Sequence, residues 1–201
     1  MCMSEYFQTL GQRSVAEYKD CGSRFIAHAF PISKPTEAKI LLQELKKQHP
    51  MAQHYCYAYR LGVDADNCRS TDDGEPAGSA GKPILNQIQS KGLTNVLVVV
   101  VRYFGGNLLG VPGLMNAYKM ATMLALQLSP VVQKPLTTPC TLNFDYTLVN
   151  EVMRVVKAYS AAVISQENQL FCNMHIEVPL KRLHEFEHVI KELKNVDLKA
   201  G

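Results

Sequence analysis

Three carboxylates within a stretch of four residues form the densest group of potentially reactive side chains in this sequence. They are Asp72, Asp73 and Glu75. Such a group could hold Mg²⁺ through oxygen ligands alone, or could carry acid–base chemistry. Aspartate and glutamate also accept hydrogen bonds from the backbone of turns and helix starts, and we favour this structural role. No nucleophile paired with a base accompanies the three carboxylates in the sequence.

A glycine-rich segment follows the carboxylates and reads Gly78-Ser-Ala-Gly-Lys-Pro83. Small residues, a lysine and the start of a helix together favour contact with an anion. Pro76, however, stands where a nucleotide-hydrolysing P-loop has its first glycine, and Pro83 replaces the serine or threonine that would hold Mg²⁺. The segment therefore predicts anion contact without ATP hydrolysis.

A second glycine-rich loop begins with Arg102-Tyr-Phe-Gly-Gly106 and continues to Leu114. Arg102 could bind a phosphate or could pair internally with a carboxylate of the first loop, and the sequence favours neither role. Tyr103 has the same two possibilities. The candidate residues for ligand or anion binding are Arg69, Asp72, Asp73, Glu75, Gly78, Gly81, Lys82, Arg102, Tyr103, Gly105 and Gly106. No catalytic residue, metal ligand or cofactor is predicted.

The elements that position these loops follow from the hydrophobic pattern. Residues Val96–Val101 are all apolar, which predicts a strand buried on both faces. A helix over Pro83–Lys91 precedes this strand, and a helix over Gly113–Leu128 follows the second loop. The alternating segment His54–Leu61 predicts another strand, in which we expect His54 to be a packed histidine and not a ligand or general base.

The rest of the chain completes an α+β protein of two domains. Strands are predicted at residues 15–18 and 24–30, and a helix follows them with its apolar positions from Ala38 to Leu45. Prolines between residues 130 and 139 indicate a linker, with a domain boundary near residue 135. Beyond it the pattern is strand, helix, strand, strand, helix, strand, which is the order of a ferredoxin-like domain. Its elements are predicted at 141–146, 148–159, 161–165, 169–178, 183–193 and 196–198.

Composition restricts the class of protein. The chain has 201 residues, of which 47% are hydrophobic and 19% charged, and its net charge of +3 permits a nucleic-acid partner without requiring one. Its six cysteines form no C-x-x-C pair, which argues against structural zinc. No leader pattern or membrane-spanning apolar run is present, so we expect a cytoplasmic protein with reduced thiols and no membrane partner.

Several of these segments closely resemble the Impact/YigZ family, a group of two-domain proteins linked to translation. The resemblance rests on Thr71–Pro83, Val99–Gly106 and Gly113-Leu114, and it extends to Ser23-Arg-Phe25 and His54–Tyr59. It implies an Impact N-terminal-like domain over residues 1–132, similar to the second domain of ribosomal protein five of the small subunit. It also implies a ferredoxin-like domain over residues 137–201 that resembles the end of elongation factor G.

The sequence departs from the family pattern at three positions. Ser79 stands where threonine is usual, Leu108 where lysine is usual, and Pro112 where glycine is usual. Proline should stiffen the second loop, and the missing lysine weakens any grip of this loop on phosphate. The resemblance supplies no catalytic residues.

These observations lead to three hypotheses about function. The first is a regulatory binding protein that contacts RNA, the ribosome or a translation-regulating protein, with Arg69, Lys82 and Arg102 on phosphates. The second is a Mg-dependent hydrolase acting on a phosphate ester, with Asp72, Asp73 and Glu75 around the metal. The third is a protein–protein adaptor in which the loops are purely structural.

Overall fold

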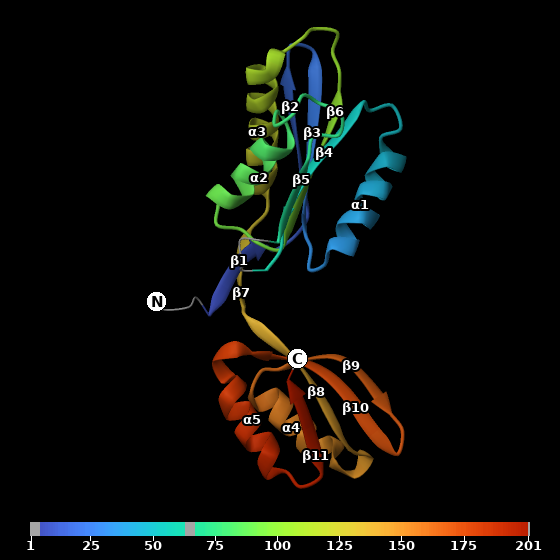
Figure 1. Ribbon diagram of the computed structural model, residues 1–201, viewed down its shortest axis with the longest axis vertical. Helices are drawn as coiled ribbons and strands as arrows, with labels where there is room; N and C mark the ends of the chain where they lie inside the picture. Colours follow the sequence, from blue (N-terminus) through green and yellow to red (C-terminus); the bar gives the residue numbers. More distant parts are fainter. Residues whose placement is uncertain (1–4, 63–66, 201) are drawn as a thin grey trace. The chain divides into compact units, whose positions relative to one another are not determined.

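The computed structural model describes residues 5–62 and 67–200, which form an α+β protein with two compact units (Figure 1). The N-terminal unit comprises residues 7–134, and the C-terminal unit comprises residues 135–200 together with residues 5 and 6. Cys2, residues 63–66 and the outer ends of the two predicted domains lie outside the described residues.

The N-terminal unit is built on an antiparallel sheet of five strands in the order β2-β3-β6-β4-β5. The strands are β2 (Ser14–Asp20), β3 (Ser23–Pro31), β4 (His54–Arg60), β5 (Cys68–Thr71) and β6 (Val96–Tyr103). The central strand β6 contains the apolar run, and residues 96 to 101 are completely buried. The prediction of a strand buried on both faces is therefore confirmed.

Helices cover both faces of this sheet, which explains why β6 shows no alternation of polar and apolar residues (Figure 1). On one face, Val96, Val98 and Val100 belong to a core with α2 (Gly81–Ser90) and α3 (Gly110–Leu128). On the other, the side chains of Leu97, Val99 and Val101 belong to a core with α1 (Pro35–Gln48). Alternate residues of β6 thus pack on opposite faces of the sheet.

One buried histidine lies in the core beneath α1. His28 on β3 is 8% exposed, and its ring centroid lies 5.5 Å from that of His49. Burial disfavours the charged imidazole, and the neighbouring His49 adds to the effect, so the pKa of His28 is lowered to about 4. The unfolded chain titrates near 6.5 and binds more protons than the folded chain at pH values between these two. Stability is therefore lost as the pH falls through this window.

We expect His28 to cost the protein about 2 kcal/mol of unfolding free energy between pH 7.5 and pH 5. Chemical denaturation at the two pH values measures this loss. His28→Leu should remove most of it, because leucine takes up no proton. The exposed His184 on α5 (Leu183–Glu192) provides a matched control, and His184→Leu should leave the pH dependence in place. An equal pH dependence in His28→Leu and the parent would contradict the assignment.

Two segments predicted as loop or linker are strands. β7 (Val131–Pro135) pairs with β1 (Tyr6–Leu10) in a small sheet, although prolines in this region indicated a linker. Proline is tolerated at the end of a strand, where its missing N–H breaks no ladder, and Pro135 is the last residue of β7. The edge strand β5 leads into the first loop, and no local pattern revealed its pairing with β4.

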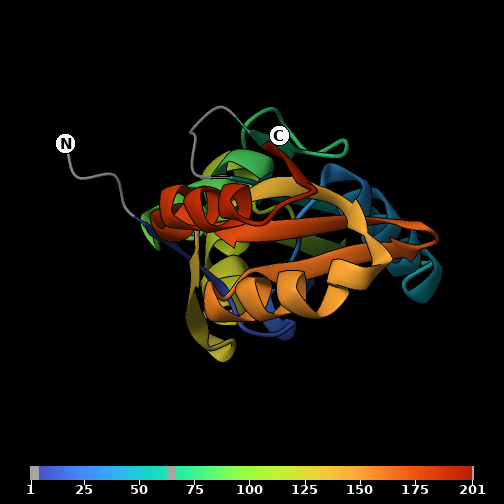
Figure 2. The ribbon, with the colours of Figure 1, turned by 90° about the horizontal axis from the view of Figure 1, so that it is seen from below.

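The C-terminal unit has the predicted element order and a sheet in the order β11-β8-β10-β9. Its elements are β8 (Thr137–Asp145), a short 3₁₀ helix (Tyr146–Leu148), α4 (Val149–Ala158), β9 (Ala162–Asn168), β10 (Phe171–Pro179), a second 3₁₀ helix (Leu180–Arg182), α5 and β11 (Val196–Ala200). Figure 2 shows α4 and α5 side by side against this sheet. Alternate residues of β8 and β10 are buried beneath them, as the sequence pattern predicted.

Two further properties concern the thiols and the membrane. Cys21, Cys56, Cys68, Cys140 and Cys172 form no disulfide with one another. Across the described residues, no helix combines the length and apolar character that crossing a membrane requires.

Candidate binding site at the two glycine-rich loops

The carboxylate of Asp72 organises the first loop. It accepts hydrogen bonds from the backbone N–H groups of Gly78 (2.9 Å), Ala80 (3.0 Å) and Gly81 (2.8 Å). Burial alone would raise the pKa of Asp72, but the three N–H donors outweigh it and the pKa is lowered. The ionised carboxylate of Asp72 therefore connects the first loop to the start of α2 by accepting hydrogen bonds from both.

Gly81 lets this loop fold back on the strand that precedes it. A Cβ atom at this position would lie 2.7 Å from the backbone nitrogen of Thr71. Only glycine allows such a close approach of two backbone segments. The fold thus requires glycine at position 81 whether or not a ligand binds.

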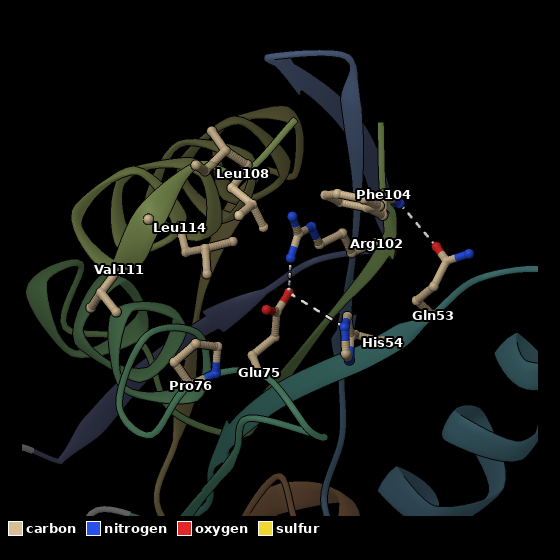
Figure 3. A pocket seen from close by; sticks show the side chains of 11 residues that line it. Gln53, His54, Glu75, Pro76, Arg102, Phe104, Leu108, Val111 and Leu114 are labelled. Atoms are coloured by element: carbon tan, nitrogen blue, oxygen red, sulfur yellow. Dashed lines mark hydrogen bonds and ion pairs between the residues drawn. The ribbon is translucent and has the colours of Figure 1, made fainter. Parts of the chain in front are cut away.

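Asp73 fixes the loop to the neighbouring strand β4. Its Oδ2 accepts a hydrogen bond from the backbone N–H of Tyr55 at 2.7 Å. Its carbonyl oxygen lies 2.8 Å from Nδ1 of His54, and because a carbonyl only accepts, Nδ1 carries the proton. His54 is therefore held in one ring orientation, with Nε2 turned toward Glu75 at 4.0 Å from Oε1 (Figure 3).

Glu75 and Arg102 form a buried ion pair that connects the two loops (Figure 3). Arg102 Nη1 donates to Oε1 of Glu75 at 2.6 Å, and the hydroxyl of Tyr118 on α3 donates to the same oxygen at 2.7 Å. The side chains of Glu75 and Arg102 are 3% and 6% exposed. Of the two roles considered for Arg102, the structure shows the internal pair.

Three neighbouring strands present a row of side chains around this pair. In the sheet register, Arg102 lies directly between Phe25 on β3 and His54 on β4. The guanidinium carbon of Arg102 is 5.3 Å from the ring centre of Phe25 and 5.5 Å from that of Phe104. Both aromatic rings can stabilise the cation through their π faces.

A cavity of about 450 Å³ opens above the ion pair. Its floor is formed by His54, Glu75 and Arg102. Most of its wall is apolar and is contributed by Pro76, Phe104, Leu108, Leu109, Val111 and Leu114. Figure 3 shows the guanidinium of Arg102 projecting from β6 toward Leu108 and Leu114. This volume lies within the range of small-molecule sites in proteins.

The other candidate residues lie around this centre or apart from it. Lys82 is exposed in the first turn of α2, and Gly78, Gly105 and Gly106 lie in the loops.

Tyr103 faces the opposite side of the sheet from Arg102, where its hydroxyl lies 2.9 Å from Nδ1 of His49. Arg69 is paired with Tyr59 across β5 and β4, which puts its exposed side chain on that same α1 face.

The three carboxylates do not converge on one point. Asp72 binds loop amides, Asp73 binds Tyr55 and Glu75 binds Arg102 and Tyr118. Among the residues described, no cluster of three His, Cys, Asp or Glu side chains is placed to hold a metal ion. The geometry therefore gives no support to the hypothesis of a Mg-dependent phosphate-ester hydrolase.

Tyr118 and Cys56 also contact the carboxylate residues of the first loop, which the sequence did not predict. The thiol of Cys56 lies 2.9 Å from the carbonyl oxygen of Asp72 and 3.3 Å from the hydroxyl of Tyr118. Burial raises the pKa of both the Cys56 thiol and the Tyr118 hydroxyl, so both remain protonated hydrogen-bond donors. One available signal was the strand alternation, which places Cys56 on the same face of β4 as His54.

Comparison with known proteins gives a consistent assignment. The model of the Impact N-terminal domain matches residues 21–126, which include both glycine-rich loops. "IMPACT family member YigZ" of Escherichia coli is 33% identical over 166 residues, covering 82% of this chain and 81% of that protein. "IMPACT family member YvyE" of Bacillus subtilis is 34% identical over 183 residues, covering 89% of this chain and 83% of that protein.

A solved crystal structure extends the similarity to the fold. It belongs to a protein described only as hypothetical, is 28% identical in sequence and superposes with a TM-score of 0.79. The match covers 99% of this chain and 98% of the other. With the family model covering more than half of the sequence, this chain belongs to the IMPACT family.

Proposed function

We propose that this chain is a translation-associated regulatory binding protein that contacts RNA, the ribosome or a translation partner through its two glycine-rich loops. The observation that carries the proposal is membership of the IMPACT family, which supports a translation-associated regulatory role in the broad sense. The geometry favours binding over catalysis, because the polar side chains of the loops hold one another in place. The three carboxylates each have a different partner and do not converge on one point.

The proposed contact surface has an exposed part and a supporting part. Arg69, on the α1 face, and Lys82, in the first turn of α2 on the other face, are exposed and carry the positive charge that a phosphate backbone attracts. The loop backbone at Gly78, Gly105 and Gly106 allows close approach of a partner, although the N–H groups of Gly78 and Gly105 are already bound to Asp72 and Ser23. Asp72, Asp73, Glu75, Gly81 and Arg102 hold the loops in shape from below. Tyr103, on the α1 face, would contact a partner only if that partner also reached Arg69.

The proposal assigns separate roles to the two parts of the chain. Residues 1–132 would act as an Impact N-terminal-like domain related to the second domain of ribosomal protein five. Residues 137–201 would act as a ferredoxin-like domain resembling the end of elongation factor G. The sheet order β11-β8-β10-β9 with two helices on one face supports the second assignment. Such a protein would work in the cytoplasm.

The test is co-sedimentation of the purified chain with ribosomes and with RNA over a series of salt concentrations. Association through phosphates should weaken steeply with salt, and each lost phosphate contact should reduce the log–log slope by about 1. Arg69→Glu combined with Lys82→Glu should therefore flatten the slope by about 2 and weaken binding at low salt.

A matched control reverses two exposed charges elsewhere in the same unit. Lys39→Glu combined with Lys47→Glu changes the net charge by the same amount on α1. This control should retain most of the association. If the parent protein shows no salt-sensitive association with ribosomes or RNA, contact through phosphates is wrong. Equal losses in the two double variants would show that net charge, and not the loop surface, drives binding.

A further inference from the structure

We propose that the cavity above Glu75 and Arg102 is a binding site for a small organic carboxylate with an apolar body. The proposal concerns a ligand different in kind from a nucleic acid or a ribosome and does not rest on the proposed function. It follows from three features of the cavity: a buried guanidinium with unused donors, an uncapped helix start and an apolar wall.

The guanidinium of Arg102 retains hydrogen-bonding capacity after pairing with Glu75. A guanidinium has five N–H donors, whereas the described residues show a single hydrogen bond from it, from Nη1 to Glu75. Its Nε is buried and has no partner among those residues, although the residue is only 5% exposed. The enclosed Nε is not reached from the cavity, but an oxygen acceptor placed there would bind the other terminal nitrogen, Nη2, for which the described residues show no hydrogen bond.

The start of helix α3 contributes donors to the same space. Gly110 and Val111 form the first turn of this helix of 19 residues and line the cavity. Backbone N–H groups in a first turn have no partner within the helix and carry partial positive charge. The N-cap residue is Leu109, which offers no side-chain acceptor, and no acidic residue occupies the first turn. An anion in the cavity would therefore meet the helix start and Arg102 together.

Charge and volume limit the class of anion. Glu75 already neutralises part of the charge of Arg102, so the floor can balance one negative charge better than the two of a phosphate monoester. Apart from Gln53, whose Oε1 is already bound to the N–H of Phe104, the wall of Phe104, Leu108, Leu109, Val111 and Leu114 is apolar and favours a ligand with an apolar body. A cavity of about 450 Å³ has room for roughly 15 water-sized groups. A monocarboxylate with a short aliphatic or aromatic body fits the charge of the floor, the apolar wall and the volume of the cavity.

The test is titration of the full chain with 4-methylpentanoate, with its neutral amide 4-methylpentanamide and with inorganic phosphate. Calorimetry measures affinity, and ¹H–¹⁵N NMR locates the site. We expect saturable binding of the acid at one site, with shifts at the amides of Phe104, Leu109, Gly110 and Val111. The amide and phosphate should each bind at least about tenfold more weakly, since a donor-rich floor selects an anion and an apolar wall rejects a dianion.

Variants at the rim avoid the risk of unfolding that comes with changing Arg102. Leu108 is 90% exposed, and Leu108→Glu would place a negative charge at the mouth of the cavity. It should weaken binding of the acid by about tenfold or more through like-charge repulsion. The matched control Leu170→Glu changes a residue that is 84% exposed and does not line the cavity, and it should bind the acid within twofold of the parent.

Four outcomes would overturn the proposal: no saturable binding of the acid, equal binding of the acid and its amide, equal effects of Leu108→Glu and Leu170→Glu, or tighter binding of phosphate than of the acid. Because Leu108→Glu leaves Arg69 and Lys82 unchanged, failure here is distinguishable from failure of the ribosome or RNA association.

Discussion

Replacing Glu75 with glutamine is expected to lower the free energy of unfolding by about 3 to 5 kcal/mol. Glutamine preserves the shape of the side chain and can still accept a hydrogen bond from Tyr118, which lies 2.7 Å from the present carboxylate. It removes the negative charge, however, and leaves the buried guanidinium of Arg102 without a counter-ion. Urea denaturation measures the loss, with NMR signals from β6 reporting on the N-terminal unit.

An exposed ion pair in the same unit provides the control. Arg24 Nε lies 2.9 Å from Oε1 of Glu17, and the side chains of Arg24 and Glu17 are 49% and 34% exposed. Water and salt screen such a pair, so Glu17→Gln should leave the unfolding free energy nearly unchanged. If the two glutamine variants were equally stable, burial of the Glu75–Arg102 pair would have no energetic consequence and the description of the site would be wrong.

Gly105→Ala is the second change with a large expected effect. A Cβ atom at this position would lie 1.9 Å from the backbone carbonyl carbon of Gly22 and 2.3 Å from the nitrogen of Ser23. Backbone atoms cannot move aside as the end of a flexible side chain can. The second loop would have to separate from the β2–β3 turn, which also breaks the hydrogen bond from Gly105 N to Ser23 Oγ. We expect a loss of at least about 3 kcal/mol in unfolding free energy.

The neighbouring glycine separates crowding from backbone strain. Gly106 has a φ of +88°, but apart from its chain neighbours no described residue has an atom within 4 Å of the Cβ position. Gly106→Ala should therefore cost only the strain of a left-handed backbone, about 1 to 2 kcal/mol. Thermal and urea unfolding of both variants measure the difference. A Gly105→Ala protein as stable as Gly106→Ala would contradict the close contact between the second loop and residues 22 and 23.

The sequence predicts most of the fold where local pattern and length agree. The apolar run Val96–Val101 specifies a central strand because both of its faces are covered, and the alternation of β10 specifies a strand with one face buried. β5 and β7 lack such a signal. Both are short strands. β7 pairs with β1, which is distant in sequence, and the prolines around β7 indicated a linker, whereas β5 is an edge strand held by its pairing with β4.

The site was only partly predictable for the same physical reason. The glycine pattern identified the two loops, and the acid-rich turn correctly suggested that Asp72 accepts hydrogen bonds from backbone amides. The sequence left Arg102 between two roles because the register that places it next to His54 is a tertiary property. Tyr118 lies sixteen residues after Arg102, and its hydroxyl reaches Glu75 only because α3 packs on the sheet. Tyr103 and Arg102 adjoin in sequence yet face opposite sides.

The connection of the two loops through Glu75 and Arg102 is tested most directly by a double-mutant cycle with Glu75→Gln and Arg102→Met. Each single variant leaves one buried polar or charged group without its partner, whereas the double variant removes both charges together. We predict that the double variant is more stable than the sum of the single losses implies, with a coupling of about 2 kcal/mol or more. Losses that add within about 0.5 kcal/mol would contradict a direct interaction between the loops.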